Sequence, residues 1–146
     1  MQRRYLLICG VVFLLAAADA ADDVKKELAR FEGTWKIISL ETEQNKLTED
    51  ALKHIQLKLE GDKFTTVDEN RETRGTFKPD PSKKPKTIDM TMTDGPLKGK
   101  TMLGIYELEG DTYKVCVDVQ GKSRPTEFAV KPGSGYVLEI LNREKK

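Results

Sequence analysis

Apolar and polar residues alternate along the middle of the chain with the period of a β-strand. Over residues 55–60 each apolar side chain is followed by a polar one, which predicts one buried and one solvated face. The pair Gly61-Asp62 ends this run, and segment 59–64 has the same order of residue chemistry as segment 108–113. Glycine at the first central position of a two-residue loop is typical of a type II′ turn. The pattern therefore predicts two antiparallel hairpins.

Similar short runs, separated by connections rich in Pro and Gly, continue to the end of the chain. They predict about eight to nine strands in one all-β domain. The predicted strands are 35–41, 55–60, 63–68, 74–78, 87–93, 101–109, 112–119, 127–131 and 136–142. Such a series is typical of an up-and-down barrel or a sandwich, and closure into a barrel removes exposed sheet edges.

Two segments have helical character. Residues 22–30 are mostly charged, but Val24, Leu28 and Phe31 fall on one helical face. We expect this segment to lie across one end of the strand-rich domain. Residues 47–54 predict a short helix, because acidic residues stand near its start and basic residues near its end.

The N-terminus has the three parts of a secretory signal peptide. Two arginines precede an apolar run at residues 6–18, and small residues then precede a cut expected after Ala20. The apolar run is shorter than the about 20 residues that a helix needs to span a bilayer. We therefore expect a signal peptide over residues 1–20 and a single secreted or periplasmic domain over residues 21–146. An uncleaved N-terminal anchor is the alternative.

Charge argues against one broad class of function. The chain has 25 basic and 24 acidic residues, and removal of the leader would leave equal numbers of each. Nucleic-acid binders derive much of their affinity from excess positive charge, so no nucleic-acid partner is expected. Charges of both signs are interleaved, which is typical of a solvated barrel exterior.

Few residues of this chain could form a disulfide, take part in catalysis or bind a metal ion. Cys116 would be the only cysteine after cleavage, so the fold is expected to have no disulfide. His54 is the only histidine, and the chain has no Gly-x-Ser-x-Gly motif. Residues 68–79 begin like a calcium loop but lack its required glycine and final glutamate. We therefore expect no enzyme activity, no catalytic residue, no metal and no cofactor.

The order of Gly33-Thr34-Trp35, a short helix and a meander of strands resembles the lipocalin and fatty-acid-binding superfamily. Over residues 28–143 the chain is similar to a lipocalin-like domain of unknown function found as many paralogues in Planctomycetes-type bacteria. The stretches that carry this resemblance are 33–35, 85–89, 104–108, 110–116 and 124–128.

The resemblance implies a lipocalin-like antiparallel up-and-down barrel with one short helix after the first strand and a short N-terminal helical segment. It implies no activity, because the bacterial group has none assigned. In lipocalins an arginine at the end of the last strand often covers the tryptophan ring, and Arg143 stands in the matching place. The Arg-x-Tyr pattern that holds carboxylates in intracellular fatty-acid binders is absent, because no tyrosine follows Arg143.

The barrel interior is the candidate binding site. Small barrels of about eight strands are either filled by their own side chains or hold one small ligand. The predicted lining residues are Trp35, Phe64, Met90, Met92, Met102, Tyr106, Tyr113 and Phe128, with Arg74 and Arg124 at the mouth. We expect a monomeric, non-catalytic binding protein for a small, mostly apolar ligand. The alternative is a side-chain-filled barrel that acts as a cell-surface or periplasmic interaction module with a protein or glycan partner.

Overall fold

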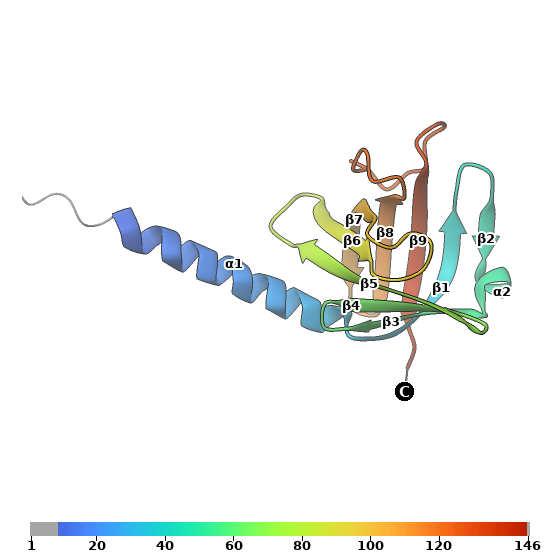
Figure 1. The fold of residues 1–146 in the computed structure, drawn as a ribbon, viewed down its shortest axis with the longest axis horizontal. Helices are drawn as coiled ribbons and strands as arrows, with labels where there is room; N and C mark the ends of the chain where they lie inside the picture. Colours follow the sequence, from blue (N-terminus) through green and yellow to red (C-terminus); the bar gives the residue numbers. More distant parts are fainter. Residues whose placement is uncertain (1–8, 146) are drawn as a thin grey trace, which may run out of the picture.

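Eight antiparallel strands close into a β-barrel, and a long helix meets one end of it (Figure 1). The computed structural model describes the backbone of residues 9–145 and the side chains of residues 19–145. The elements are α1 (Cys9–Phe31), β1 (Gly33–Glu41), β2 (Lys46–Thr48), α2 (Glu49–Leu52), β3 (Ile55–Glu60), β4 (Lys63–Asp68), β5 (Arg71–Asp80), β6 (Lys86–Met92), β7 (Thr101–Glu109), β8 (Thr112–Asp118) and β9 (Tyr136–Arg143).

The sheet closes because β1 has two partners in the barrel. Strands β3 to β9 pair in chain order, and β1 pairs with both β3 and β9. The short strand β2 extends β1 beyond the barrel as a ninth strand. The predicted all-β, antiparallel barrel is confirmed, and its topology is compatible with a lipocalin-like fold.

Both predicted hairpin turns are present. Gly61 joins β3 to β4 with φ 58°, and Gly110 joins β7 to β8 with φ 56°. A type I′ turn would also require positive φ at the second loop residue. Among the described residues, Glu69 is the only non-glycine residue with positive φ, so neither aspartate in these loops has it. Positive φ at the first position alone is the signature of a type II′ turn.

The helix predicted for residues 47–54 is shorter than expected. α2 covers only Glu49–Leu52, whereas Leu47 belongs to β2 and pairs with Leu40 of β1. Thr48 has extended backbone angles, φ −104° and ψ 173°, and marks the change from strand to helix. The single helical turn places Leu52 in the core, where it is 1% exposed.

The strand predicted for residues 127–131 is wrong, because the chain from β8 to β9 forms an irregular loop. The carboxylate of Asp118 is buried at the start of this loop and accepts three backbone N–H groups at 2.8–2.9 Å, from Gln120, Lys122 and Ser123. Later in the loop the thiol of Cys116 lies 3.8 Å from the carbonyl oxygen of Ala129. The loop between β8 and β9 is thus held on the outside of the barrel by contacts with side chains, and not by the backbone hydrogen bonds of a β-ladder.

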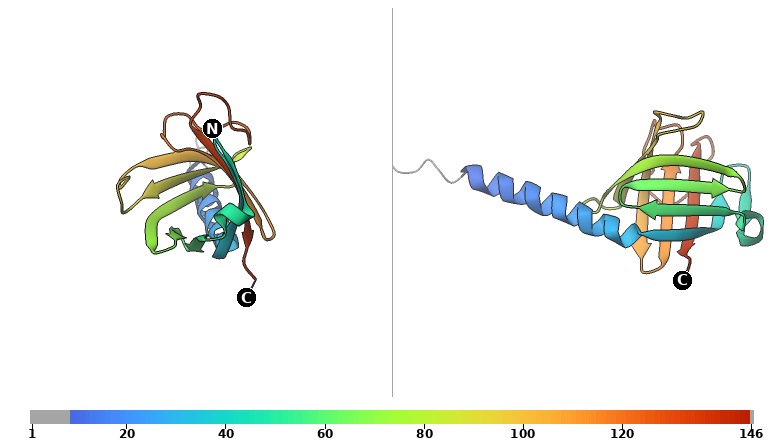
Figure 2. Two further views of the ribbon diagram at one scale, coloured as in Figure 1. Left: turned by 90° about the vertical axis from the view of Figure 1, so that its right-hand side faces the viewer. Right: turned by 60° about the horizontal axis from the view of Figure 1, so that its bottom comes forward.

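Only the C-terminal end of α1 touches the barrel, and the rest of the helix extends away from it (Figure 2). The predicted apolar face is confirmed, since Val24 and Leu28 are half-buried and Phe31 is fully buried. The expected cut after Ala20 lies within α1, whereas the two arginines of the predicted leader lie outside the described residues. Within residues 9–145, no helix combines the length and the apolar character needed to cross a membrane.

Trp35 and Arg143 join the end of α1 to the end of β9. The Trp35 indole is fully buried, and its Nε1–H donates to the carbonyl oxygen of Phe31 at 2.8 Å. The Arg143 guanidinium lies 4.3 Å from the centre of the Trp35 ring and donates to the carbonyl oxygens of Arg30 and Glu32. These donors satisfy carbonyl groups that the end of a helix leaves without partners. The predicted covering of the tryptophan by Arg143 is therefore confirmed.

We expect the Arg143→Ala substitution to lower the free energy of unfolding by about 1–3 kcal/mol, through loss of a cation–π contact and of hydrogen bonds to carbonyl groups. Urea unfolding followed by Trp35 fluorescence would measure the change. Arg71→Ala is the matched control, because its side chain is 88% exposed. An Arg143→Ala protein that unfolds at the same urea concentration as the wild type would contradict the assigned contact.

Candidate functional site

The end of the barrel that meets α1 is filled by aromatic rings. The centre of the Phe31 ring lies 5.3 Å from that of Phe77 and 5.2 Å from those of Tyr106 and Tyr113. Trp35 packs edge-on against Tyr113 at 5.8 Å. All of these residues are at most 4% exposed. This half of the interior is a packed core, so it leaves the opposite half as the place where a ligand could enter.

An ion cluster around a buried carboxylate lies at the aromatic end of the barrel. Glu27 on α1 is 5% exposed and accepts hydrogen bonds from the Tyr106 hydroxyl at 2.9 Å, Lys86 Nζ at 3.1 Å and Arg30 Nη1 at 2.9 Å. Burial by itself would raise the pKa of Glu27, but the three donors together lower it below its ordinary value. This carboxylate is fully satisfied, and its role is to hold α1 on the barrel.

At the opposite end the interior is half-buried and mostly apolar. Leu40, Ile55, Met90, Met102, Val119 and Val137 are partly buried there and pack against the core; we call these residues the apolar rim. Met90 and Met102 are directly opposite each other on β6 and β7. On β4 and β5 the inward positions are taken by Thr66 and Thr73, which also face each other and are half-buried. Methionine side chains are flexible, so this wall can adapt its shape.

An unpaired carboxyl group points into this half of the barrel, whereas Asp68, opposite Ile55 at the same end, pairs with His54 and Arg71. Glu139 on β9 is opposite Val115 of β8 and Leu40 of β1, and its neighbours on the same face of β9 are Val137 and Leu141. Its side chain forms no hydrogen bond and no ion pair with any described residue, and the residue remains half-buried. Burial raises the pKa of Glu139 to about 7.

The hydroxyl group of Tyr113 lies near this carboxyl group. Tyr113 is 2% exposed, and burial followed by the charge of Glu139 raises its pKa above the ordinary value. Its hydroxyl has no hydrogen-bond partner among the described residues, yet no fully enclosed polar side-chain atom in this part of the chain lacks one. The Tyr113 oxygen therefore keeps contact with accessible space inside the barrel.

Glu139 is not among the predicted lining residues, because β9 is apolar on both faces. Residues 137, 138, 140 and 141 are all aliphatic, so no alternation indicates which side of the strand the glutamate occupies. The register with β1 and β8 decides it. A carboxylate inside an otherwise aliphatic strand was the only signal available.

Most of the predicted lining residues do lie in the interior. Phe64, Met92, Tyr106, Tyr113 and Trp35 are buried in the core, and Met90 and Met102 belong to the apolar rim. The Phe64 ring covers Gly75, its partner on β5, so closely that a Cβ at position 75 would lie 2.3 Å from it. Of the predicted lining residues, Phe64 and the aromatic residues near α1 thus fill part of the interior, and Met90 and Met102 border the half-buried end.

Phe128 does not point inward as predicted. Its ring lies on the outer loop beneath Lys114, with Nζ 4.5 Å from the ring centre. Lys114 is on the outer face of β8, because its neighbours Tyr113 and Val115 face the core. The predicted inward position depended on a strand over residues 127–131 that does not form.

The two predicted mouth arginines also lie outside the barrel. Arg74 pairs with Glu72 and, at 3.4 Å, with Asp94. Arg124 anchors the outer loop, because its guanidinium donates to Asp89 at 2.6 Å and to the carbonyl oxygens of Ile88 and Gly104 at 3.1 and 2.8 Å. Neither guanidinium reaches the interior, so the barrel has no cation at these two positions.

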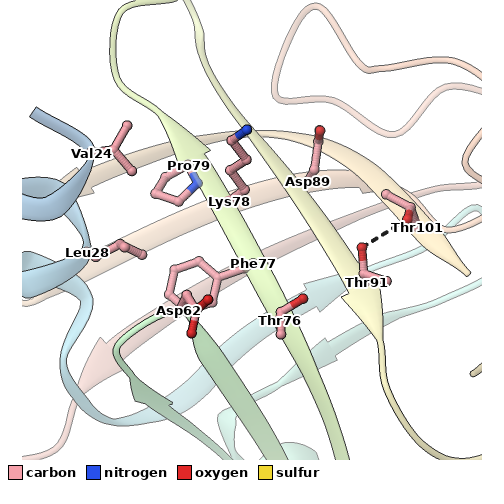
Figure 3. Close-up of a pocket in the computed structure, with 10 residues that line it drawn as sticks. All are labelled: Val24, Leu28, Asp62, Thr76, Phe77, Lys78, Pro79, Asp89, Thr91 and Thr101. Atoms are coloured by element: carbon pink, nitrogen blue, oxygen red, sulfur yellow. Dashed lines mark hydrogen bonds between the residues drawn. The ribbon is translucent and has the colours of Figure 1, made fainter. Parts of the chain in front are cut away.

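A cleft of about 550 Å³ lies on the outside, between α1 and strands β5 and β6 (Figure 3). Val24, Leu28, Asp62, Thr76, Phe77, Lys78, Pro79, Asp89, Thr91 and Thr101 line it. Thr91 and Thr101 share a hydrogen bond of 2.9 Å, and Asp89 is already paired with Arg124. The cleft is open to solvent and its polar groups do not converge, so it offers fewer specific contacts than the barrel interior.

The other candidate groups are His54, near the open end of the barrel, and Cys116, on its outside. His54 Nε2 lies 3.4 Å from Asp68 Oδ1 at an exposed edge, and Cys116 is buried beneath the outer loop, where burial raises its pKa. Within the described residues, no three His, Cys, Asp or Glu side chains are close enough together to hold a metal ion.

The chain matches no protein-family model, no curated protein and no solved structure.

Proposed function

We propose that this protein is an exported, non-catalytic binding protein for a small, mostly apolar ligand, held in the half of the barrel away from α1. The observation that carries the proposal is the contrast between the two halves of the interior. Aromatic rings close one half, whereas a rim of half-buried apolar side chains surrounds an unpaired carboxyl group in the other. Partly exposed apolar surface around a few polar groups is typical of ligand sites.

The side chains of this protein fit a binding role better than a catalytic role. A nucleophile needs a base within hydrogen-bond reach, about 2.6–3.2 Å. His54 is bound to Asp68 at an exposed edge, and the buried Cys116 thiol contacts only a carbonyl group. These positions support a binding role and supply no pair for acyl or phosphoryl transfer.

Export follows from the N-terminal pattern of arginines, an apolar run and small residues before position 21. A cut after Ala20 would retain every α1 residue that holds the helix on the barrel, including Glu27 and Phe31. The resemblance to the lipocalin-like domain of Planctomycetes-type bacteria belongs to the same proposal.

The test is native mass spectrometry of the full chain, expressed in an exporting bacterial host and purified gently. We expect extra mass that disappears on denaturation, and a mature mass that begins at residue 21. In the Met90→Trp variant the larger ring should displace the ligand, because position 90 is on the apolar rim, while thermal stability should change by less than about 1 kcal/mol if space is present. Leu97→Trp is the matched control, since Leu97 is 48% exposed.

A different outcome would favour the second candidate function. A mass of protein alone from several hosts, together with a loss of about 1–3 kcal/mol in Met90→Trp, would indicate overpacking of a filled barrel. The filled aromatic half supports this alternative, in which the protein is an interaction module and the outer cleft beside α1 is the surface to test.

A further inference from the structure

We propose that the ligand is an amphipathic amine, with an apolar body against the apolar rim and an ammonium group on the carboxylate of Glu139. This inference rests on the proposed binding function and adds the chemical class of the ligand. Its evidence is the place of Glu139 in the barrel and the absence of a partner for it among the described side chains.

The two buried carboxylates among the described residues show how this fold satisfies negative charge. Glu27 receives three side-chain donors at the α1 end, and Asp118 receives three backbone N–H groups in the outer loop. Glu139 receives none from the described residues. A half-buried carboxylate without partners costs free energy, and a cation brought by a ligand would lower that cost.

No basic side chain among residues 19–145 forms an ion pair with Glu139. The side chains that face Glu139 from β8 are Tyr113, Val115 and Val117, and from β1 they are Ile37 and Leu40. Near this end of the interior, Asp68 lies 3.4 Å from His54 and 3.9 Å from Arg71. Tyr113 can offer one hydroxyl group but no charge. A cation or a strong donor on the ligand would supply a partner that these side chains do not.

The same geometry disfavours an anionic ligand. A fatty acid would place its carboxylate beside Glu139, and like charges in a poorly solvated site repel each other strongly. The two arginines predicted for the mouth, which could have offset this repulsion, lie on the outer face. An uncharged alcohol would gain the apolar contacts and one hydrogen bond, so it separates the contribution of charge from that of shape.

The pKa of Glu139, raised to about 7 by burial, supports the inference in a measurable way. Below that pH the free protein holds Glu139 protonated, and an ammonium ligand must displace the proton in order to form an ion pair. Amine binding should therefore weaken by up to about tenfold for each pH unit below 7 and should release protons near pH 6. Alcohol binding should not weaken as the pH falls and should release no protons.

The experiment compares hexylamine, 1-hexanol and hexanoate by titration calorimetry at pH 8, using full chain expressed in an exporting host and freed of bound ligand. We expect hexylamine to bind about 10- to 100-fold more tightly than hexanol, and hexanoate to bind most weakly. In Glu139→Gln the preference for hexylamine over hexanol should disappear, because hexylamine loses its ion pair. Glu109→Gln, at an exposed position outside the barrel, should retain the preference.

Two results would overturn the inference separately from the proposed function. Equal affinity for the amine and the alcohol in the wild type, or a preference that survives in Glu139→Gln, would leave a binding barrel without amine selectivity. Failure of all three probes to bind, together with a mass of protein alone in native mass spectrometry, would reject both. If Glu139→Gln does not fold, the test is proton release by the wild type on binding hexylamine, measured in buffers of different ionisation enthalpy. Absence of proton release near pH 6 would contradict the ion pair.

Discussion

Replacement of Phe31 by alanine is expected to lower the free energy of unfolding by about 3–5 kcal/mol, the usual cost of removing a fully buried aromatic side chain. Phe31 is 0% exposed, and its ring is surrounded by those of Phe77, Tyr106 and Tyr113. The substitution would open a cavity at the point where α1 closes the barrel. It would also loosen the carbonyl group that accepts the Trp35 indole N–H. Urea unfolding monitored by circular dichroism would measure the loss.

Two further variants separate packing from the presence of a ring. Phe31→Leu keeps most of the buried volume and should lose less than half as much stability as Phe31→Ala. Phe128→Ala removes a ring that lies on the outer loop, and it should cost about 1 kcal/mol or less because that position is half-buried. A loss below about 1 kcal/mol in Phe31→Ala would show that the end of α1 does not form part of the core.

The Glu139→Gln substitution is expected to remove a fall in stability that the wild type shows between about pH 4.5 and 7. The pKa of Glu139 is raised from 4.5 to about 7 in the folded protein. Below pH 4.5 both folded and unfolded states bind the proton, so the group has no effect on stability. As the pH rises towards 7, the unfolded chain releases the proton first and is favoured. The loss levels off above pH 7 at about 1–3 kcal/mol, since one pKa unit corresponds to about 1.4 kcal/mol and the group is only half-buried.

Other carboxyl groups act in a different pH range, which makes the measurement clean. The lowered pKa values of Glu27 and Asp118 contribute stability that is present above their ordinary values and is lost as the pH falls through the lowered values. Urea midpoints taken at intervals from pH 4.5 to 8 would therefore isolate Glu139. The Glu109→Gln control should follow the wild-type curve. A wild-type curve that stays flat from pH 4.5 to 8 would show that Glu139 is well solvated.

Predictions from local pattern succeeded where one face of an element is clearly apolar. The alternation in residues 55–60 and the two Gly-Asp loops predicted hairpins with the correct turns, because turn type depends on a few adjacent backbone angles. The helical face with Leu28 and Phe31 was also correct. The pairing of Trp35 with Arg143 came from family resemblance, and the register of β1 and β9 confirms it.

The incorrect predictions have a different physical cause. The sequence does not show which of two similar surfaces a segment or side chain packs against. Residues 127–131 have strand-like composition, but Asp118 and Arg124 hold the chain against the outer face before another strand can pair. The inward position predicted for Phe128 depended on that incorrect strand. Glu139 was missed because its strand is aliphatic on both sides, so only the register could place it.

The sequence by itself determined the short antiparallel strands, their hairpin turns and the apolar face of the helix that precedes them. Those features depend on interactions between near neighbours, whose spacing is visible in the chain. Closure into a barrel depends on the pairing of β1 with β9, which are far apart in the sequence. The tertiary structure alone decided which polar groups face the interior. Arg74 and Arg124 lie outside while Glu139 lies inside, because one step in register moves a side chain to the opposite face of a sheet. The candidate site, and the charge of the ligand that it would accept, depend on that single step.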